Sequence, residues 1–234
     1  MTATQRFELF SFWRTSATYR VRVALNLKGL SAEERNINVD AGENRSEAFL
    51  KINPLGALPA FIDHGPGSDS TPITQSLAIL EYLEDIHPIP PLLPEGAFAR
   101  ARVRSLAAMM AADTHPLITP RIRKYLTTEG KFDDAAWRAW QIHWFTTGLQ
   151  ALERRLATAK ATGAFAHGDR SPSLTFVLRA LSQSPGCSRS KYPIFRQSIA
   201  LWPGASNWRL SNAPSRAASS ARPRRCDLIL APSL

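Results

Sequence analysis

The sequence predicts a small mixed α/β domain followed by an all-α domain. Three observations support this prediction: short apolar strands alternate with amphipathic helices in residues 1–87, prolines crowd residues 88–94, and long helical patterns fill residues 95–170. With 234 residues, the chain can form one large core or two smaller ones. Residues 171–234 differ in composition from everything before them.

The first strand and the first helix are predicted from an apolar run and the residues that follow it. Residues 8–12, Glu-Leu-Phe-Ser-Phe, are typical of a short buried strand. A helix is expected over residues 16–28. Thr15 or Ser16 can cap its N-terminus, and Gly29 stands where a glycine commonly ends a helix.

Three further strands and two helices complete the predicted α/β domain. The strands are expected over residues 34–39, 58–62 and 72–74, the last at a sheet edge. A short helix over residues 45–52 must stop near Asn53-Pro54, because the residue before a proline disfavours the helical conformation. An amphipathic helix is expected over residues 75–87. The order β-α-β-α-β-β-α suits a small mixed sheet with helices on both faces.

Residues 88–94, Pro-Ile-Pro-Pro-Leu-Leu-Pro, are interpreted as a stiff linker at a domain boundary. Two long helical stretches are expected beyond it, over residues 98–126 and 133–162. The second stretch carries three tryptophans on one helix face, Trp137, Trp140 and Trp144. We interpret this stripe as packed helix core rather than as a ligand cage.

The net charge of +10 is concentrated near the C-terminus. Residues 171–234 hold nine basic residues and one acidic residue, whereas residues 1–170 hold 20 basic and 18 acidic residues. A nucleic-acid partner is therefore not expected for the first 170 residues. No apolar run reaches the roughly 18 residues of a membrane span, and no signal peptide is evident. We accordingly expect a cytoplasmic protein without a membrane partner.

Metal and nucleotide chemistry find no support in the sequence. The two cysteines, Cys187 and Cys226, form neither a disulfide framework nor a metal-binding cluster. P-loop, G-x-G-x-x-G, H-E-x-x-H and C-x-x-C patterns are all absent from the sequence. No metal site is predicted.

Four segments, in order along the chain, carry a resemblance to a known family. They are residues 12–29 (Phe-Trp-Arg-Thr-Ser-Ala-Thr-Tyr-Arg-Val-Arg-Val-Ala-Leu-Asn-Leu-Lys-Gly), 53–59 (Asn-Pro-Leu-Gly-Ala-Leu-Pro), 75–84 (Gln-Ser-Leu-Ala-Ile-Leu-Glu-Tyr-Leu-Glu) and 113–117 (Asp-Thr-His-Pro-Leu). Together they resemble the zeta-class glutathione S-transferases, which include maleylacetoacetate and maleylpyruvate isomerases. The resemblance implies the glutathione transferase fold, with a thioredoxin-like N-terminal domain and an all-α C-terminal domain. It also implies glutathione as cofactor, and a homodimer.

The activity implied by the resemblance is glutathione-dependent cis–trans isomerisation of maleylacetoacetate or maleylpyruvate, small dicarboxylic enones of aromatic catabolism. A thiolate adds to the alkene, the resulting single bond rotates, and elimination gives the trans isomer. Two alternatives stay open. One is a general glutathione transferase or dehalogenase that uses the same thiolate, and the other is a non-catalytic protein that binds glutathione.

Thr15 and Ser16 are the candidate catalytic residues, and with Ala17 they are candidate cofactor contacts. A hydroxyl donor and a helix N-terminus both stabilise a thiolate. Position alone favours a simple helix cap, whereas the resemblance favours contact with the thiol. Many relatives carry Ser-Ser-Cys where this chain has Thr15-Ser16-Ala17, so no cysteine is available here. Thr15 keeps a hydroxyl at the position that matches the family's thiol-contacting serine, and which of the two hydroxyls contacts the sulfur stays open.

Further cofactor contacts follow from the resemblance. Leu58-Pro59 matches the family's cis-proline turn, whose backbone pairs with the cofactor like an added strand; the alternative is a trans proline opening a strand. Gln75 and Ser76 begin a helix, which suits the γ-glutamyl carboxylate, and they equally suit a simple cap. Asn44 aligns loosely with a residue near the glycyl end.

The candidate substrate-binding residues are Arg14, Arg121 and His115, and the resemblance implies the two arginines because they match positions near the substrate pocket of maleylpyruvate isomerases. Arginine suits a dicarboxylic substrate because its planar fork donates two hydrogen bonds to a carboxylate. His115 is a candidate donor to cofactor or substrate, with a plain helix-break role before proline as the alternative. Arg20 and Arg22 are interpreted as structural or solvated.

The resemblance ends near residue 170. The following 64 residues contain 13 serines and seven prolines, a composition poorly suited to the helices expected there. An offset reading frame over residues 174–179 can encode Ala-Asp-Ile-Cys-Leu-Ala, which resembles the family's continuation. We therefore interpret residues 171–234 as a basic tail that results from a frameshift and replaces the last helices of the family. The alternative is a genuine basic tail for nucleic acid or anionic lipid.

Overall fold

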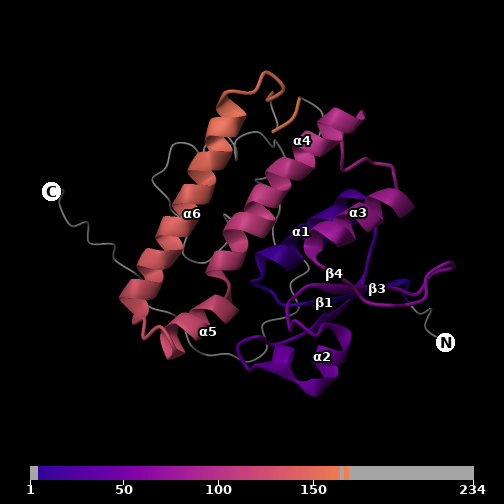
Figure 1. Ribbon diagram of the computed structural model, residues 1–234. Helices are drawn as coiled ribbons and strands as arrows, with labels where there is room; N and C mark the ends of the chain where they lie inside the picture. Colours follow the sequence, from indigo (N-terminus) through magenta and orange to yellow (C-terminus); the bar gives the residue numbers. More distant parts are fainter. Residues whose placement is uncertain (1–4, 164–165, 169–234) are drawn as a thin grey trace. The chain divides into compact units, whose positions relative to one another are not determined.

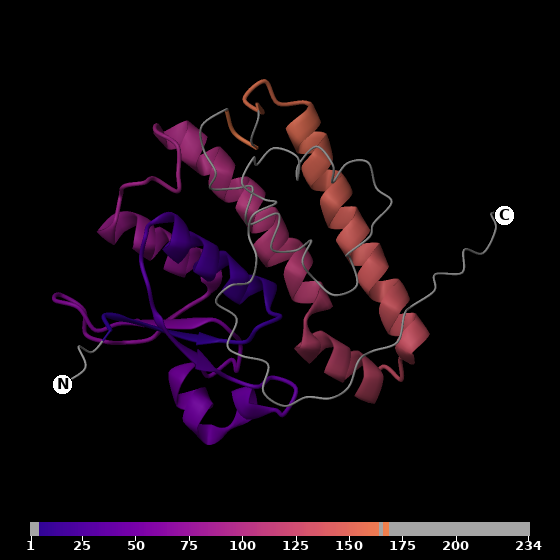
Figure 2. The ribbon, with the colours of Figure 1, turned by 180° about the vertical axis from the view of Figure 1, so that it is seen from behind.

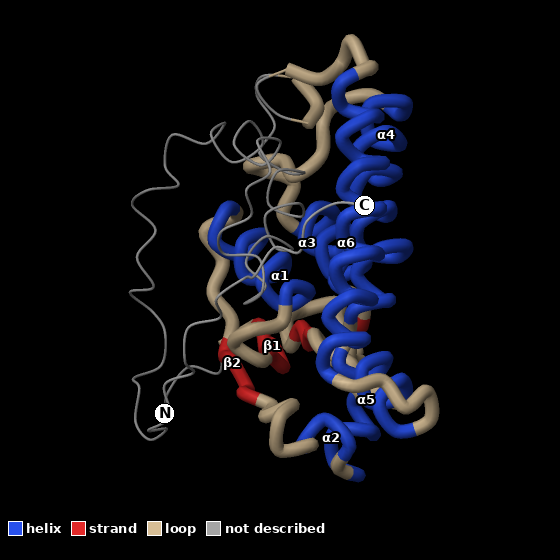
Figure 3. The backbone as a smooth tube through the Cα atoms, turned by 90° about the vertical axis from the view of Figure 1, so that its left-hand side faces the viewer, coloured by secondary structure: helices blue, strands red, loops and turns tan. Residues whose placement is uncertain are grey.

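The computed structural model describes residues 5–163 and 166–168, so the hypothesis about residues 171–234 lies outside the described residues. Its sheet has the order β2-β1-β3-β4, with β1, β3 and β4 labelled in Figure 1 and β2 in Figure 3. The strands are β1 (Phe7–Ser11), β2 (Glu33–Asn36), β3 (Ala60–Asp63) and β4 (Ile73–Thr74). β1 runs parallel to β2 and antiparallel to β3, and β4 forms an antiparallel edge, which confirms the predicted small mixed sheet.

The helices of this domain lie on both faces of the sheet, as predicted. They are α1 (Ser16–Leu27), a 3-10 turn (Glu43–Arg45) with α2 (Glu47–Ile52), and α3 (Ser76–Ile86). α1 and α3 cover one face, and Figure 3 shows the strands between α1 and α2. The order β-α-β-α-β-β-α and the α/β class of the N-terminal domain are thus confirmed.

α1 ends just before Gly29, the glycine that the sequence marks as the end of the helix. The Leu30 N–H donates to the Leu25 carbonyl at 2.9 Å, and the Gly29 N–H donates to the Asn26 carbonyl at 3.1 Å. Gly29 adopts a φ of 66°, which glycine reaches without a steric penalty. This pair of bonds is the Schellman arrangement, and it turns the chain away from α1 toward β2.

The helical region contains α4 (Ala97–Ala108), α5 (Pro120–Thr128) and α6 (Asp134–Ala157). A π-helical turn (Met109–Thr114) and a 3-10 turn (His115–Ile118) separate α4 from α5. The expectation of one helical stretch over residues 98–126 is therefore wrong. Pro116 and Pro120 lack the N–H that a continuing helix needs, so the helix breaks where the resemblance at residues 113–117 implies.

α4 and α6 run alongside each other (Figures 1 and 2), and Arg155 of α6 donates to Ser105 Oγ of α4 at 2.9 Å. Asp133 caps α6 by accepting a hydrogen bond from the Ala136 N–H at 2.7 Å. α6 ends at Ala157, five residues earlier than expected.

The tryptophan stripe of α6 is only partly buried. Trp137 is buried, which confirms the interpretation as core for that residue. Trp140 and Trp144 are half-buried, their rings 5.7 Å apart between centroids. The Trp140 Nε1–H donates to the Leu117 carbonyl at 2.8 Å, so it ties α6 to the helix break.

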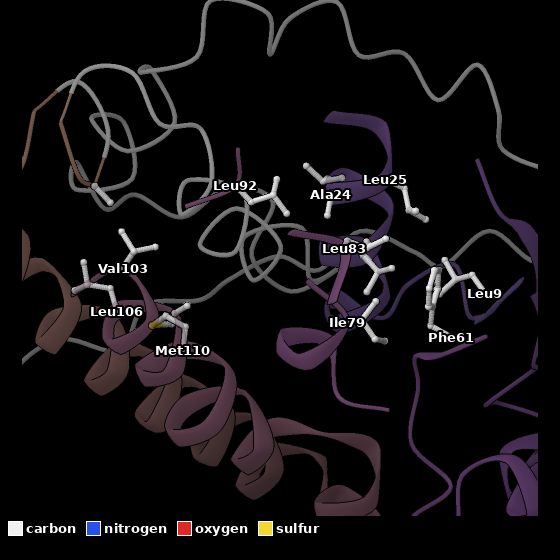
Figure 4. Close-up of a cluster of buried hydrophobic side chains, with 14 of the residues drawn as sticks. Leu9, Ala24, Leu25, Phe61, Ile79, Leu83, Leu92, Val103, Leu106 and Met110 are labelled. Carbon is white, nitrogen blue, oxygen red and sulfur yellow. The ribbon is translucent and has the colours of Figure 1, made fainter. Parts of the chain in front are cut away.

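One buried apolar cluster joins the sheet, α1, α3 and the helical region (Figure 4). Labelled members are Leu9, Ala24, Leu25, Phe61, Ile79, Leu83, Leu92, Val103, Leu106 and Met110. Leu92 belongs to the proline-rich segment and anchors it in the core, whereas residues 88–91 of the same segment are exposed. No helix in the described part of the chain is long and apolar enough to cross a membrane.

A buried ion pair anchors the proline-rich segment. Lys28 Nζ donates to Glu84 Oε2 at 2.8 Å and to the Pro90 carbonyl at 3.0 Å, while Glu84 accepts from the Leu92 N–H at 2.8 Å. The side chains of Lys28 and Glu84 are 0% and 6% exposed. Residues 88–94 are therefore fixed against both α1 and α3.

Candidate active site

A hydroxyl–imidazole pair joins the start of α1 to the helix break. Ser16, the first residue of α1, is buried, and its Oγ lies 2.7 Å from Nε2 of His115. Either Ser16 donates to an unprotonated Nε2, or a protonated Nε2 donates to Ser16 Oγ. In the second arrangement the serine keeps its own hydrogen free for another acceptor.

His115 is electrostatically kept neutral. Burial, the charge of Arg20 and the charge of Arg121 together lower the pKa of His115 from 6.5 to about 3. At neutral pH the imidazole is therefore an uncharged hydrogen-bond partner rather than an acid. Arg121, an exposed residue of α5, therefore lies close enough to His115 for its charge to act on the imidazole.

Thr15 is directed into its own turn. It occupies the N-cap position of α1, but its side chain makes no capping hydrogen bond, so the expected cap is wrong for this residue. Its hydroxyl is instead within reach of the Phe12 carbonyl at 3.1 Å and of Thr18 Oγ1. Ala17 is buried and adds only backbone groups. The hydroxyl that faces His115 is that of Ser16.

Arg20 lies one turn after Ser16 on α1 and is 1% exposed. Its Nη1 donates to Ser76 Oγ at 2.9 Å, whereas its Nε and Nη2 have no hydrogen-bond partner within the described part of the chain. Burial lowers the pKa of Arg20 to about 10, so it remains a cation at neutral pH. The solvated interpretation is wrong for Arg20, and only the i, i+4 spacing to Ser16 signalled its place.

The start of α3 faces the same cation. Ser76 is the first residue of α3 and is buried. Gln75 precedes it with a φ of 70°, a left-handed conformation that costs a non-glycine residue about 1–3 kcal/mol. Neither residue caps the helix through its side chain, so the simple cap expected as an alternative is not formed.

The Leu58–Pro59 peptide is cis, which confirms the prediction of a cis-proline turn over the trans alternative. The turn leads into β3, where Ala60 lies opposite Thr74 of β4. Leu58-Pro59 and Gln75-Ser76 are therefore at the same end of this strand pair.

Two predicted residues have other partners. Arg14 forms an exposed ion pair with Asp40 and stacks over the rings of Phe12 and Trp13 at 5.5 and 5.8 Å. Asn44 Nδ2 donates to the Gly56 carbonyl at 2.7 Å, so it supports the loop before the cis-proline turn. The structure does not bring either side chain to the Ser16–His115 pair.

The donors of the site fit an anionic thiol ligand. Two buried hydroxyls begin two helices, and a buried guanidinium donates to one of them while its other two nitrogens have no partner among the described residues. A tripeptide with a thiol and two carboxylates, such as glutathione, matches this set. Within residues 5–163 and 166–168, no group of three or more His, Cys, Asp or Glu residues could hold a metal ion.

Comparisons with known proteins agree with this geometry. Residues 5–85 match the family model described as "Glutathione S-transferase, N-terminal domain". The chain is 39% identical over 162 residues to a maleylpyruvate isomerase of Ralstonia, covering 69% of this chain and 74% of that protein.

Two solved structures show the same fold. One is the holo form of a maleyl pyruvate isomerase, a bacterial zeta-class glutathione S-transferase; it has a TM-score of 0.74 and 33% identity, over 85% of this chain and 97% of that one. The other is a maleylacetoacetate isomerase of Methylobacterium extorquens AM1 with bound malonate and GSH; it has a TM-score of 0.70 and 37% identity, over 85% of this chain and 99% of that one. The predicted glutathione transferase fold is thus confirmed, and this chain belongs to the zeta-class glutathione S-transferases, the family of the maleylacetoacetate and maleylpyruvate isomerases.

Proposed function

We propose that this protein is a glutathione-dependent cis–trans isomerase of maleylacetoacetate or maleylpyruvate. The observation that carries the proposal is the Ser16–His115 pair at the N-terminus of α1, where a hydroxyl and helix N–H groups converge. The relatives described above carry the names of these two isomerases, and one of them was solved with bound GSH.

Glutathione, when bound, supplies the thiol that adds to the substrate's double bond. Ser16 donates its hydroxyl hydrogen to the sulfur and so stabilises the thiolate. Neutral His115, protonated on Nε2, holds Ser16 Oγ in the orientation for this donation. Thr15 and Ala17 shape the first turn, whose backbone N–H groups add to the positive potential.

The remainder of the cofactor lies along the cis-proline turn at Leu58-Pro59 and the N-terminus of α3. Gln75 and Ser76 take the γ-glutamyl carboxylate at the N-terminus of α3, and the Leu58 backbone beside cis-Pro59 pairs with the cysteinyl segment. Asn44 acts near the glycyl end by supporting the loop through Gly56.

Two arginines and His115 serve the dicarboxylic substrate. Arg121 is the first anchor, because its charge already acts on His115. Arg14 is the second. Its pair with Asp40 is exposed, and exposed pairs contribute about 0–1 kcal/mol, so a substrate carboxylate can compete with Asp40.

The wider organisation is part of the same proposal. Residues 1–87 form the glutathione-binding domain, residues 88–94 the linker and residues 95–170 the helical domain, while residues 171–234 are a frameshifted tail. The family resemblance supports a cytoplasmic homodimer.

The proposal is tested by mixing the purified chain with each cis-enone, with and without glutathione, and measuring formation of the trans isomer. Turnover that requires glutathione is the expected result. Faster turnover of a chlorinated acid would instead favour the dehalogenase. Glutathione binding without thiolate absorbance or turnover would favour a binding protein.

A further inference from the structure

Arg20 is a buried cation that has no counterion among residues 5–163 and 166–168. Its side chain is 1% exposed, it makes one hydrogen bond, and no carboxylate of a described residue pairs with it. Buried arginines are almost always paired, because removing a guanidinium from water is costly. An apolar side chain of similar length would fill the same space without that cost, so packing alone does not account for the charge.

Its neighbour on the same helix shows the ordinary arrangement. Arg22 lies two residues further along α1, so it faces a different direction. There its Nε and Nη2 donate to Glu34 at 2.8 and 2.5 Å, and its Nη2 also reaches Ser11 Oγ at 3.1 Å. The missing counterion is therefore particular to Arg20.

The position of Arg20 decides which way the Ser76 hydroxyl points. A guanidinium only donates, so Ser76 Oγ accepts the bond from Nη1 at 2.9 Å. The single hydroxyl hydrogen of Ser76 must then point to another acceptor. Ser76 is also the first residue of the 11-residue helix α3, whose N-terminus adds positive potential. Both features favour an anionic acceptor.

We propose that Arg20 is a positioning residue for a ligand carboxylate at the N-terminus of α3. It acts through Ser76: because Arg20 donates to Ser76 Oγ, the Ser76 hydroxyl is free to donate its own hydrogen to the carboxylate. The positive charge of Arg20 also balances the negative charge of the carboxylate. Under the proposed function, on which this inference rests, the carboxylate is that of the γ-glutamyl end of glutathione. The bound anion supplies the counterion that the residues described in the structure do not provide.

The test is a coupling measurement between one side chain and one ligand group. Calorimetry gives the Kd of glutathione and of 4-aminobutanoyl-cysteinylglycine, the analogue without the α-carboxylate, for the intact chain and for Arg20→Met. Glutathione should bind Arg20→Met more weakly by on the order of tenfold to a hundredfold, and the analogue's Kd should change little. Arg20→Lys, which keeps the charge, should recover part of the affinity.

Arg22→Met is the matched control, and it should leave the ratio of the two Kd values unchanged. Without ligand, Arg20→Met should unfold at the same temperature as the intact chain or at a higher one, because a buried unpaired charge is removed. Three results would overturn the inference: an equal loss of affinity for both ligands in Arg20→Met, no loss of affinity for glutathione in that variant, or no recovery of affinity in Arg20→Lys. Failure of the intact chain to bind glutathione would also overturn it. Glutathione binding without isomerisation would remove only the proposed function.

Discussion

Ser16 Oγ lies 2.7 Å from Nε2 of His115, although 99 positions separate the two residues in the chain. The pair connects the first turn of α1 to the break between α4 and α5. It also distinguishes the two neighbouring hydroxyls, because Thr15 is directed toward Phe12 and Thr18 instead.

Ser16→Ala should lower kcat by roughly tenfold to a hundredfold, because it removes a hydrogen bond to an anionic sulfur. It should also raise the pKa of bound glutathione, measured as thiolate absorbance against pH. Thr15→Val keeps the shape of the threonine and is the matched control, expected to have the smaller effect. A larger loss in Thr15→Val would assign the thiol to Thr15 instead.

The stability of the protein should decline as the pH falls from about 6.5 toward 3, in part through His115. The pKa of His115 is lowered to about 3 in the folded state, so between these pH values the unfolded chain binds a proton that the folded chain does not. His115→Gln should flatten the curve of unfolding free energy against pH in this window. Urea unfolding at a series of pH values measures it, and an unchanged slope would contradict the assignment.

Asp63 gives a separate window at lower pH. The Arg6 guanidinium, with Tyr82 and the Gly65 N–H, lowers the pKa of Asp63 from 3.8 to about 2. The stability that Asp63 contributes is complete above about pH 3.8 and is lost as the pH falls toward 2. Asp63→Asn should therefore reduce stability at neutral pH and matter little near pH 2, by the same urea measurement. Equal effects at both pH values would show that the carboxylate charge plays no part.

Lys28→Met should destabilise the protein by about 3–5 kcal/mol, because it leaves the buried Glu84 carboxylate without its cation. Adding Glu84→Leu to that variant should recover much of the loss. Arg123→Ala is the control, since its pair with Asp134 is exposed at 52% and 86%, and it should cost less than about 1 kcal/mol. Equilibrium denaturation measures all three. A small effect of Lys28→Met would mean that the pair does not anchor residues 88–94.

The gene should show a missing or extra base near the codons for residues 168–179. Sequencing that stretch checks the base directly. A frame-corrected chain should then be more soluble and more active than the chain as given, because helices would again cover α6 near Trp140 and Trp144. An intact frame, together with a cooperatively unfolding and active preparation of this chain, would reject the frameshift.

Local rules in the sequence determined the order of the elements and several of their ends. Gly29 ends α1 because glycine adopts a positive φ readily, and Pro116 breaks the helical stretch because it lacks an N–H. The same rules placed Thr15, Ser16, Gln75 and Ser76 at helix starts, and the family resemblance then made these residues candidates for the site.

The tertiary structure alone decided which of those residues meet. Ser16 rather than Thr15 faces His115, Arg20 is buried under Ser76 rather than solvated, and Arg14 pairs with Asp40. These outcomes depend on which faces of α1 and α3 pack together and on contacts between residues 26 to 99 positions apart. Sequence spacing fixes directions within one helix, whereas the burial of Arg20 and its lack of a carboxylate partner among the described residues arise only when separate elements come together.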